Sequence, residues 1–165
     1  MLISQKLAQA FNQQIGHELG ASHQYIAIAA FFHTRQLTLL KKLFMEQSEE
    51  ERQHAMKFVH YVLDTKAPLE IPAVAPPTAT FASAEAAVAA ALKWEHDVTR
   101  QITALMEIAV AENDYLAQSF LQWFIDEQLE EVVKMDRLLG VIQQAGERNL
   151  LMVEAYLVHI EAAKK

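Results

Sequence analysis

The sequence lacks cysteine, basic clusters and long hydrophobic runs. Because it contains no cysteine, disulfides and thiolate metal sites are excluded. No apolar run approaches the roughly 20 residues of a membrane span, and the first residues show neither the cationic nor the apolar region of a signal peptide. The formal net charge is −7, without the basic face that nucleic-acid phosphates require. We therefore expect a cytoplasmic protein that binds neither membranes nor nucleic acids.

Glycine and proline are also scarce, and their distribution predicts long helices. The 165 residues include 4 glycines and 4 prolines, while 52% of the residues are hydrophobic. All four prolines lie between positions 68 and 77, so the rest of the chain is free of strong helix breakers. The length fits a single domain, residues 1–165. Apolar residues recur at helical spacing in five segments, at about 4–34, 38–65, 84–112, 115–145 and 147–163.

The ends of these segments and the links between them predict the topology. Residues suited to capping helix N-termini begin the four long segments: Ser4, Thr38, Ser83 and Asp114. Short links join the first segment to the second and the third to the fourth, so each pair should be antiparallel. The second segment, as a helix, would span ~42 Å, and the link 65–83 can extend ~60 Å. We predict an all-α, antiparallel four-helix bundle with one long crossover and a short fifth helix.

Polar residues interrupt the apolar face of the second segment, within the stretch "QSEEERQHAM". The apolar stripe from Leu40 to Val62 includes Glu51 and, three residues later, His54. Glu50 lies at the edge of the same stripe. An acid and a histidine therefore occupy positions that the helical pattern assigns to the core.

The other long segments carry the same kind of interruption. Glu18 lies on the stripe of the first segment, Glu95 on that of the third, and Gln128 and Glu131 on that of the fourth, with Glu127 at its edge. Each position is near the middle of its helix, so the side chains should converge at one height of an antiparallel bundle. Buried carboxylates repel one another and are costly to leave unpaired. Because oxygen ligands with one imidazole suit divalent iron, manganese or zinc, the set predicts a metal centre.

Several of these residues also have a purely structural interpretation. A single acid on an apolar stripe is more often salt-bridged than metal-bound, and the acids could be held by hidden salt bridges in a structural or signalling bundle. Lys134, the nearest cation, is interpreted as a surface partner of Glu130, one turn away. Tyr25 either hydrogen-bonds a ligand carboxylate or is a core aromatic residue with a satisfied hydroxyl. The coincidence of interruptions on four helices favours the metal.

Four stretches of the chain resemble the non-haem bacterial ferritins: "GHELGASHQY", "EEERQHA", "KWEHDV" and "ENDYLAQSFLQWFIDEQLEE". The resemblance extends over nearly the whole chain and includes the long crossover and the short fifth segment. It implies an iron storage protein that oxidises Fe(II) with O₂ or H₂O₂. It also implies that the Fe(III) mineral is kept inside a hollow homo-oligomeric cage of about 24 subunits.

The same resemblance implies roles for the residues on the stripes. Glu18, Glu51 and His54 would hold the first iron of a dinuclear ferroxidase centre. Glu51 would bridge to the second iron, which Glu95 and Glu131 would also hold.

Further residues are implied to act around these two irons. Gln128 would lie just outside the ligands or orient a water, and Tyr25 would stand beside the centre. A third iron site would use four acids that match this chain's Glu50, Glu127, Glu130 and Glu131.

The haem-containing bacterioferritins are the nearest alternative within the family. They carry a haem-ligating methionine directly after the bridging acid, where this chain has Arg52, and a second Glu-x-x-His where it has Gln128 and Glu131. We therefore expect iron and no haem. A di-iron oxidoreductase that acts on an organic substrate without storing iron is a further alternative, although the sequence shows no sign of a substrate pocket.

Overall fold

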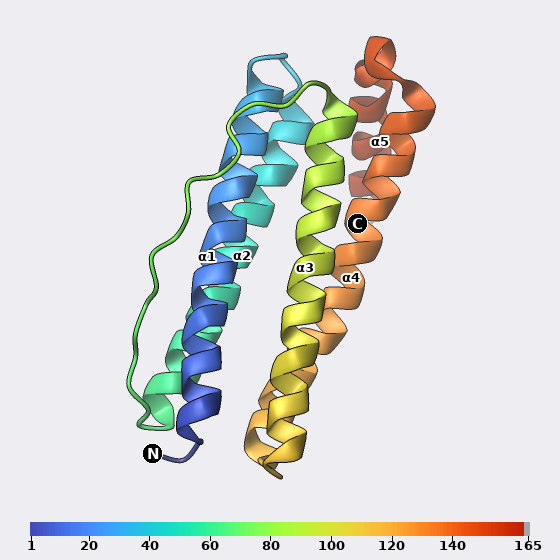
Figure 1. Ribbon diagram of the computed structural model, residues 1–165. Coiled ribbons are helices and arrows are strands. Elements are labelled where there is room, and N and C mark those ends of the chain that lie inside the picture. The colour runs from blue at the N-terminus through green and yellow to red at the C-terminus, as the bar shows by residue number, and fades with distance from the viewer. Residues whose placement is uncertain (164–165) are drawn as a thin grey trace.

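Helices are the only regular elements in residues 1–163, the part of the chain that the computed structural model describes. The chain forms four long helices and a short fifth one, and Figure 1 shows the long helices side by side with the short one at one end. Their bounds are α1 (Gln5–His33), α2 (Thr38–Asp64), α3 (Ala84–Ala111), α4 (Tyr115–Ala145) and α5 (Leu150–Ala163), with the 3₁₀ turn η1 (Glu147–Asn149) before the last. The predicted all-α bundle with a short C-terminal helix is confirmed.

Local capping explains where three of the long helices begin. The side chains of Ser4, Ser83 and Asp114 accept hydrogen bonds from the backbone N–H groups three residues later, at 2.9–3.0 Å. Gly146 follows α4 with a φ of 72°, a left-handed conformation that glycine adopts without strain. The sequence pattern predicted the three N-terminal caps.

The predicted cap of α2 is wrong, because Thr38 is already helical and no side chain next to it caps the helix. A distant residue takes this role instead. The Glu154 carboxylate of α5 accepts hydrogen bonds from the backbone N–H groups of Leu39 at 3.0 Å and Leu40 at 2.8 Å. Negative charge at a helix N-terminus also complements the helix dipole, so Glu154 both caps α2 and fastens α5 to it.

The crossover, residues 65–83, runs along α1 from one end of the bundle to the other (Figure 1). Gln24 exchanges two hydrogen bonds with the backbone of Thr78, at 2.9 and 3.0 Å. A Cβ atom at Gly16 would lie 2.4 Å from the ring of Pro72, so only glycine lets the crossover approach α1 this closely. These contacts place the start of α3 beside the end of α1, as the length of the link predicted.

The apolar core consists of two clusters, one in each half of the bundle. On α1 the first cluster ends at Ile15 and the second begins at Ala21. On α2, α3 and α4 a stretch without buried apolar residues likewise separates the two clusters. Buried acids from all four helices lie in these gaps: Glu18, Glu51, Glu95 and Glu131. A polar layer therefore crosses the middle of the core.

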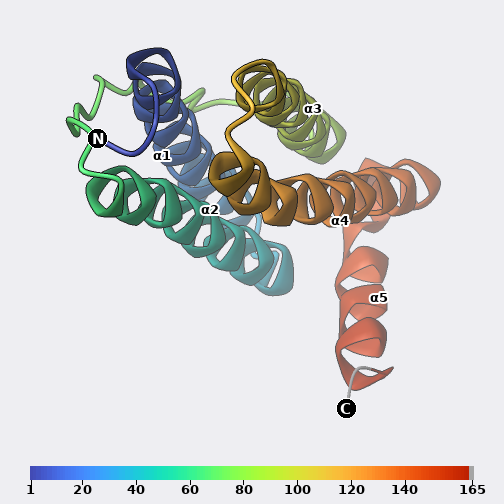
Figure 2. The ribbon, with the colours of Figure 1, turned by 90° about the horizontal axis from the view of Figure 1, so that it is seen from below.

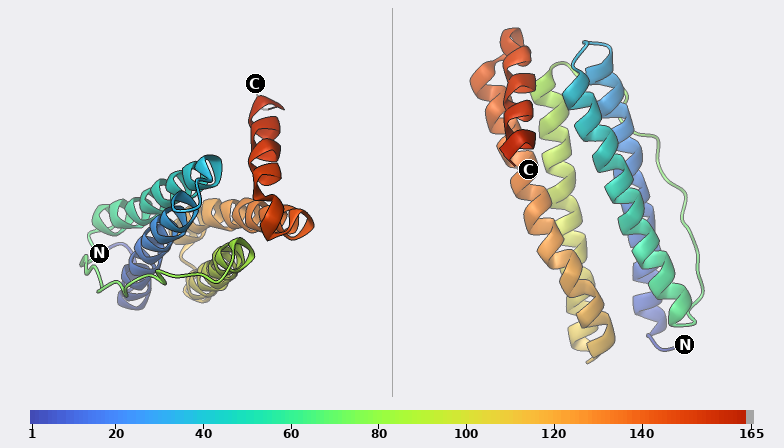
Figure 3. Two further views of the ribbon diagram at one scale, coloured as in Figure 1. Left: turned by 90° about the horizontal axis from the view of Figure 1, so that it is seen from above. Right: turned by 180° about the vertical axis from the view of Figure 1, so that it is seen from behind.

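Helix α5 projects from the bundle at a steep angle, as the end-on views in Figures 2 and 3 show. Its surface exposes three large apolar side chains, Leu151, Met152 and Val158. In residues 1–163 no helix combines the length and apolar character of a membrane span.

Candidate metal centre

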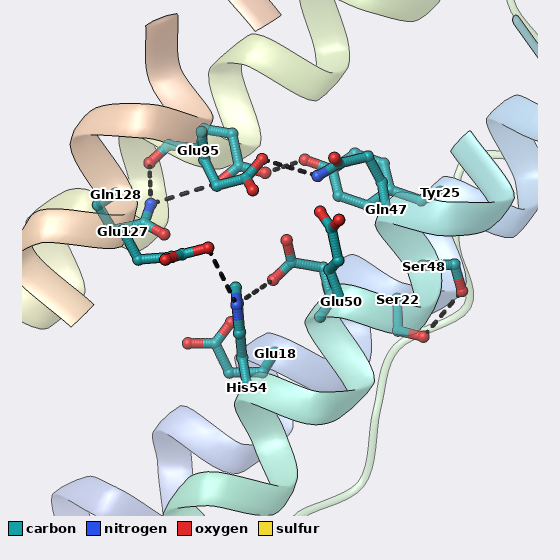
Figure 4. Close-up of polar contacts among 12 residues, drawn as sticks. Glu18, Ser22, Tyr25, Gln47, Ser48, Glu50, His54, Glu95, Glu127 and Gln128 are labelled. Carbon is teal, nitrogen blue, oxygen red and sulfur yellow. Dashed lines mark hydrogen bonds and ion pairs between the residues drawn. The ribbon is translucent and has the colours of Figure 1, made fainter. Parts of the chain in front are cut away.

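The residues that interrupt the four apolar stripes meet in the polar layer. Glu18 of α1, Glu51 and His54 of α2, Glu95 of α3 and Glu131 of α4 are all buried, with at most 4% of their surface exposed. Figure 4 shows side chains of this layer turned toward a common space between the helices. The antiparallel packing thus brings together residues that are far apart in the sequence.

These five side chains form two groups with the spacing of metal ligands. The first group contains Glu18, Glu51 and His54, and the second contains Glu51, Glu95 and Glu131. Within each group one ligand atom per residue lies within 4.8 Å of the others. Glu51 belongs to both groups, so the two groups are adjacent and share one carboxylate.

The first group contains buried oxygen atoms without a hydrogen-bond partner. Glu18 Oε1 accepts a hydrogen bond from Gln14 Nε2 at 2.9 Å, and Glu51 Oε2 lies 3.2 Å from His54 Nδ1. The second oxygens of both carboxylates, Glu18 Oε2 and Glu51 Oε1, have no partner although they are buried. Such orphaned acceptors are costly in a protein interior, and a cation would satisfy them.

In the second group, the two carboxylates other than Glu51 are already engaged. Glu95 accepts hydrogen bonds from the Tyr25 hydroxyl and, at 3.2 Å, from Gln128 Nε2 (Figure 4). Glu131 Oε2 accepts one from Gln47 Nε2 at 2.7 Å. The donors fix both carboxylates in place, as hydrogen-bonded neighbours of metal ligands commonly do.

Burial and mutual repulsion favour the protonated forms of Glu18, Glu51 and Glu95. Burial, and then the charge of Glu51, raise the pKa of Glu18 to about 8. Burial raises the pKa of Glu95 to about 7 despite the hydrogen bond from Tyr25. The pKa of Glu51 is raised well above its ordinary value by burial and by Glu95 and Glu131. Full ionisation of these acids would give the layer more negative charge than its surroundings balance, and a divalent cation would offset that charge.

Tyr25 is both a core aromatic residue and a hydrogen-bond donor to a candidate ligand, so its two interpretations hold together. Its ring is buried beside Phe44, while its hydroxyl donates to the candidate ligand Glu95. Gln128 likewise contacts Glu95 rather than solvent. Gln47 was not assigned a role from the sequence, although it lies on the same apolar stripe as Glu51, which is the signal that could have indicated one.

Apart from the buried Glu131, the acids of the expected third site are partly or fully exposed at the edge of the layer. Glu127 is partly exposed, with its Oε1 4.0 Å from His54 Nε2, and Glu130 is exposed on α4. Lys134 does not act as the expected surface partner of Glu130. Its ammonium instead contacts Gln47, Glu50 and Glu131.

Comparison with known proteins agrees with this architecture. The family profile of the ferritin-like domain matches residues 8–145. The chain belongs to the ferritin family. It is 42% identical over 152 residues to Ferritin BfrB of Mycolicibacterium smegmatis, covering 92% of this chain and 83% of that protein. It is 35% identical over 146 residues to the bacterial non-heme ferritin of Staphylococcus aureus strain MRSA252, covering 88% of each.

Solved structures of ferritins superpose closely on this one. The open pore ferritin of the archaeon Archaeoglobus fulgidus matches with a TM-score of 0.90 and 31% sequence identity, over 94% of this chain and 96% of that chain. Membership of the ferritin family supports a role in iron storage and agrees with carboxylate and histidine groups that could hold metal.

Proposed function

We propose that this ferritin oxidises Fe(II) at a dinuclear centre and stores the product as a ferric mineral. Glu18, Glu51 and His54 would bind one iron, and Glu51, Glu95 and Glu131 the other. The observation that carries the proposal is the pair of buried ligand groups that share Glu51. The orphaned oxygens of Glu18 and Glu51 support it further, since both belong to the first group.

The composition of the two groups suits oxidation of iron. Two-metal sites hold their ions about 3.5–4 Å apart, close enough for two Fe(II) ions to donate one electron each to a single O₂ or H₂O₂. Carboxylates are hard, anionic ligands that stabilise Fe(III) more than Fe(II), so they lower the cost of electron loss. With only one imidazole in the whole set, product iron is held by exchangeable oxygen ligands and can leave for the mineral.

Two neighbouring residues would position the second iron. Tyr25 and Gln128 both donate hydrogen bonds to Glu95 and would thereby hold its carboxylate toward Glu51. Neither is needed as an iron ligand in this arrangement. Their contribution is to orient a ligand before the metal arrives.

We further propose a cytoplasmic homo-oligomeric cage of about 24 subunits without haem. The exposed apolar residues of α5 support burial of this helix in an assembly. The position after Glu51 is Arg52, an exposed residue that pairs with Glu49 and offers no axial ligand to haem. A Soret band in stoichiometric amount after purification would contradict the absence of haem.

The direct test adds Fe(II) aerobically to the metal-free protein and follows absorbance and particle mass together. The proposal predicts fast Fe(II) oxidation followed by growth of a mineral inside particles with the mass of the closed cage. Oxidation by a monomer or dimer without mineral growth would favour an oxidoreductase without storage. A metal-free protein that takes up no iron would favour a structural bundle.

A further inference from the structure

The side chain of Lys134 crosses from α4 to α2 at the edge of the polar layer. Its ammonium donates hydrogen bonds to Glu131 Oε1 at 3.0 Å, to Glu50 Oε2 at 3.1 Å and to Gln47 Oε1. A lysine ammonium has three donors, so these three acceptors satisfy it completely. Two of the acceptors are carboxylates on different helices.

This contact differs from an ordinary surface salt bridge. Glu131 is a candidate metal ligand with 2% of its side chain exposed, whereas Lys134 and Glu50 are 39% and 44% exposed. Gln47 closes the arrangement, because its Nε2 donates to the other oxygen of Glu131 at 2.7 Å while its Oε1 accepts from Lys134. A surface pair costs entropy to hold in one geometry, but here the buried partners Gln47 and Glu131 hold the ammonium.

The acceptors of Lys134 overlap with the expected third iron site. Glu50 and Glu131 are two of the four acids in that set, and the ammonium lies between them. A metal ion bound between these two carboxylates would compete with Lys134 for Glu50 Oε2 and Glu131 Oε1. One positive charge is already present there, and a divalent ion beside it would be repelled.

We propose that Lys134 is a tethered cation that closes the third metal position of this ferritin. By occupying the carboxylates of Glu50 and Glu131, it restricts metal binding to the two groups that share Glu51. This inference rests on the proposed dinuclear centre, and it predicts the opposite of the three-site pattern implied by the family resemblance. Lys134 is thus a specificity-determining residue for the number of ions bound, not a ligand.

The test counts Zn(II) ions bound per subunit in the assembled, metal-free protein by calorimetry and elemental analysis. Zn(II) does not change its oxidation state, so the count is independent of iron oxidation. The wild-type protein should bind about two ions per subunit. Lys134→Met should bind about one more, because it frees the oxygens of Glu50 and Glu131 without adding a ligand.

Three further variants separate the cation from general structural effects. Lys134→Arg keeps the positive charge and should bind the same number of ions as the wild type. Lys134→Met combined with Glu50→Gln should lose the additional ion, because one of its carboxylates is gone. The matched control is Lys93→Met, which removes an exposed lysine paired with Asp97 at 2.7 Å, on the surface of α3, and should leave the count unchanged.

The possible results distinguish this inference from the proposed function. Three ions in the wild type, or equal counts in the wild type and Lys134→Met, would overturn the role of Lys134 and leave the dinuclear centre intact. No Zn(II) bound by the folded wild type would overturn the dinuclear centre, and the inference with it. If Lys134→Met does not assemble, Lys134→Gln replaces it with the same expected gain.

Discussion

The two ligand groups share Glu51 but differ in how their other atoms are satisfied. One oxygen of the shared Glu51 is buried without a partner, and in the first group one oxygen of Glu18 is as well. In the second, Glu95 and Glu131 accept hydrogen bonds from Tyr25, Gln128, Gln47 and Lys134. Hydrogen bonds to charged groups contribute about 1.5–3 kcal/mol each, and a metal must displace or share some of them. The first group should therefore bind the first ion, and the second group a more weakly held one.

The largest effect is expected from Glu51→Ala, because it removes the only residue common to both groups. Loss of the bridge misplaces the two irons relative to each other, and the fast phase of Fe(II) oxidation should slow by at least about 100-fold. Stopped-flow absorbance measures this rate. Glu49→Ala is the control, since Glu49 is an exposed acid that pairs with Arg52. A severe loss in Glu18→Ala with a mild one in Glu51→Ala would disprove the bridging assignment.

Variants that damage one group at a time should affect different binding steps. His54→Ala should weaken the first step of Zn(II) binding, and Glu131→Gln the second, each by about 10- to 100-fold. The reason is that His54 belongs only to the first group and Glu131 only to the second. Calorimetric titration resolves the two steps. If both variants weakened the same step, the division into two unequal groups would be wrong.

A smaller effect is expected on the stability of the metal-free protein. Glu95 has its pKa raised from the ordinary 4.5 to about 7 in the fold. Its contribution is therefore fully present below about pH 4.5 and is lost as the pH rises through about 7, where the folded protein must ionise a buried acid. Glu95→Gln avoids this loss and should raise the melting temperature of the metal-free protein by a few °C at about pH 8.

Two controls accompany the Glu95→Gln measurement. The gain should shrink toward zero at about pH 5, where the wild-type carboxyl is already protonated. Added metal should stabilise the variant less than the wild type, because stabilisation by a ligand follows its affinity. A fall in the metal-free melting temperature at about pH 8 would instead indicate that Glu95 forms a structural hydrogen-bond network whose loss outweighs the charge.

The smallest effect is expected from Tyr25→Phe, which removes one hydrogen bond from Glu95 and leaves every ligand in place. The second step of metal binding should change by less than about 10-fold, and the first step should not change. Tyr61→Phe is a matched control, because the Tyr61 hydroxyl is buried without a partner. An equal effect of both variants on the second step would show that the Tyr25 hydroxyl does not position Glu95.

The sequence predicted those features that depend on helical periodicity. The positions of Glu18, Glu51 and Glu95 on apolar stripes were enough to expect their convergence, because the antiparallel topology follows from the link lengths. The cap of α2 was mispredicted, because its acceptor, Glu154, is more than 110 residues away in the chain. Lys134 was assigned to Glu130 because helical spacing identifies neighbours on one helix but not a partner on the facing helix.

The difference between the two groups is tested most directly by crystals grown metal-free and soaked with less than one equivalent of Zn(II) per subunit. Anomalous scattering then locates the ions. We predict a peak among Glu18, Glu51 and His54, and a second peak among Glu51, Glu95 and Glu131 only when more Zn(II) is added. Equal peaks in both groups at low metal, or a first peak beside Glu95 and Glu131, would contradict this prediction.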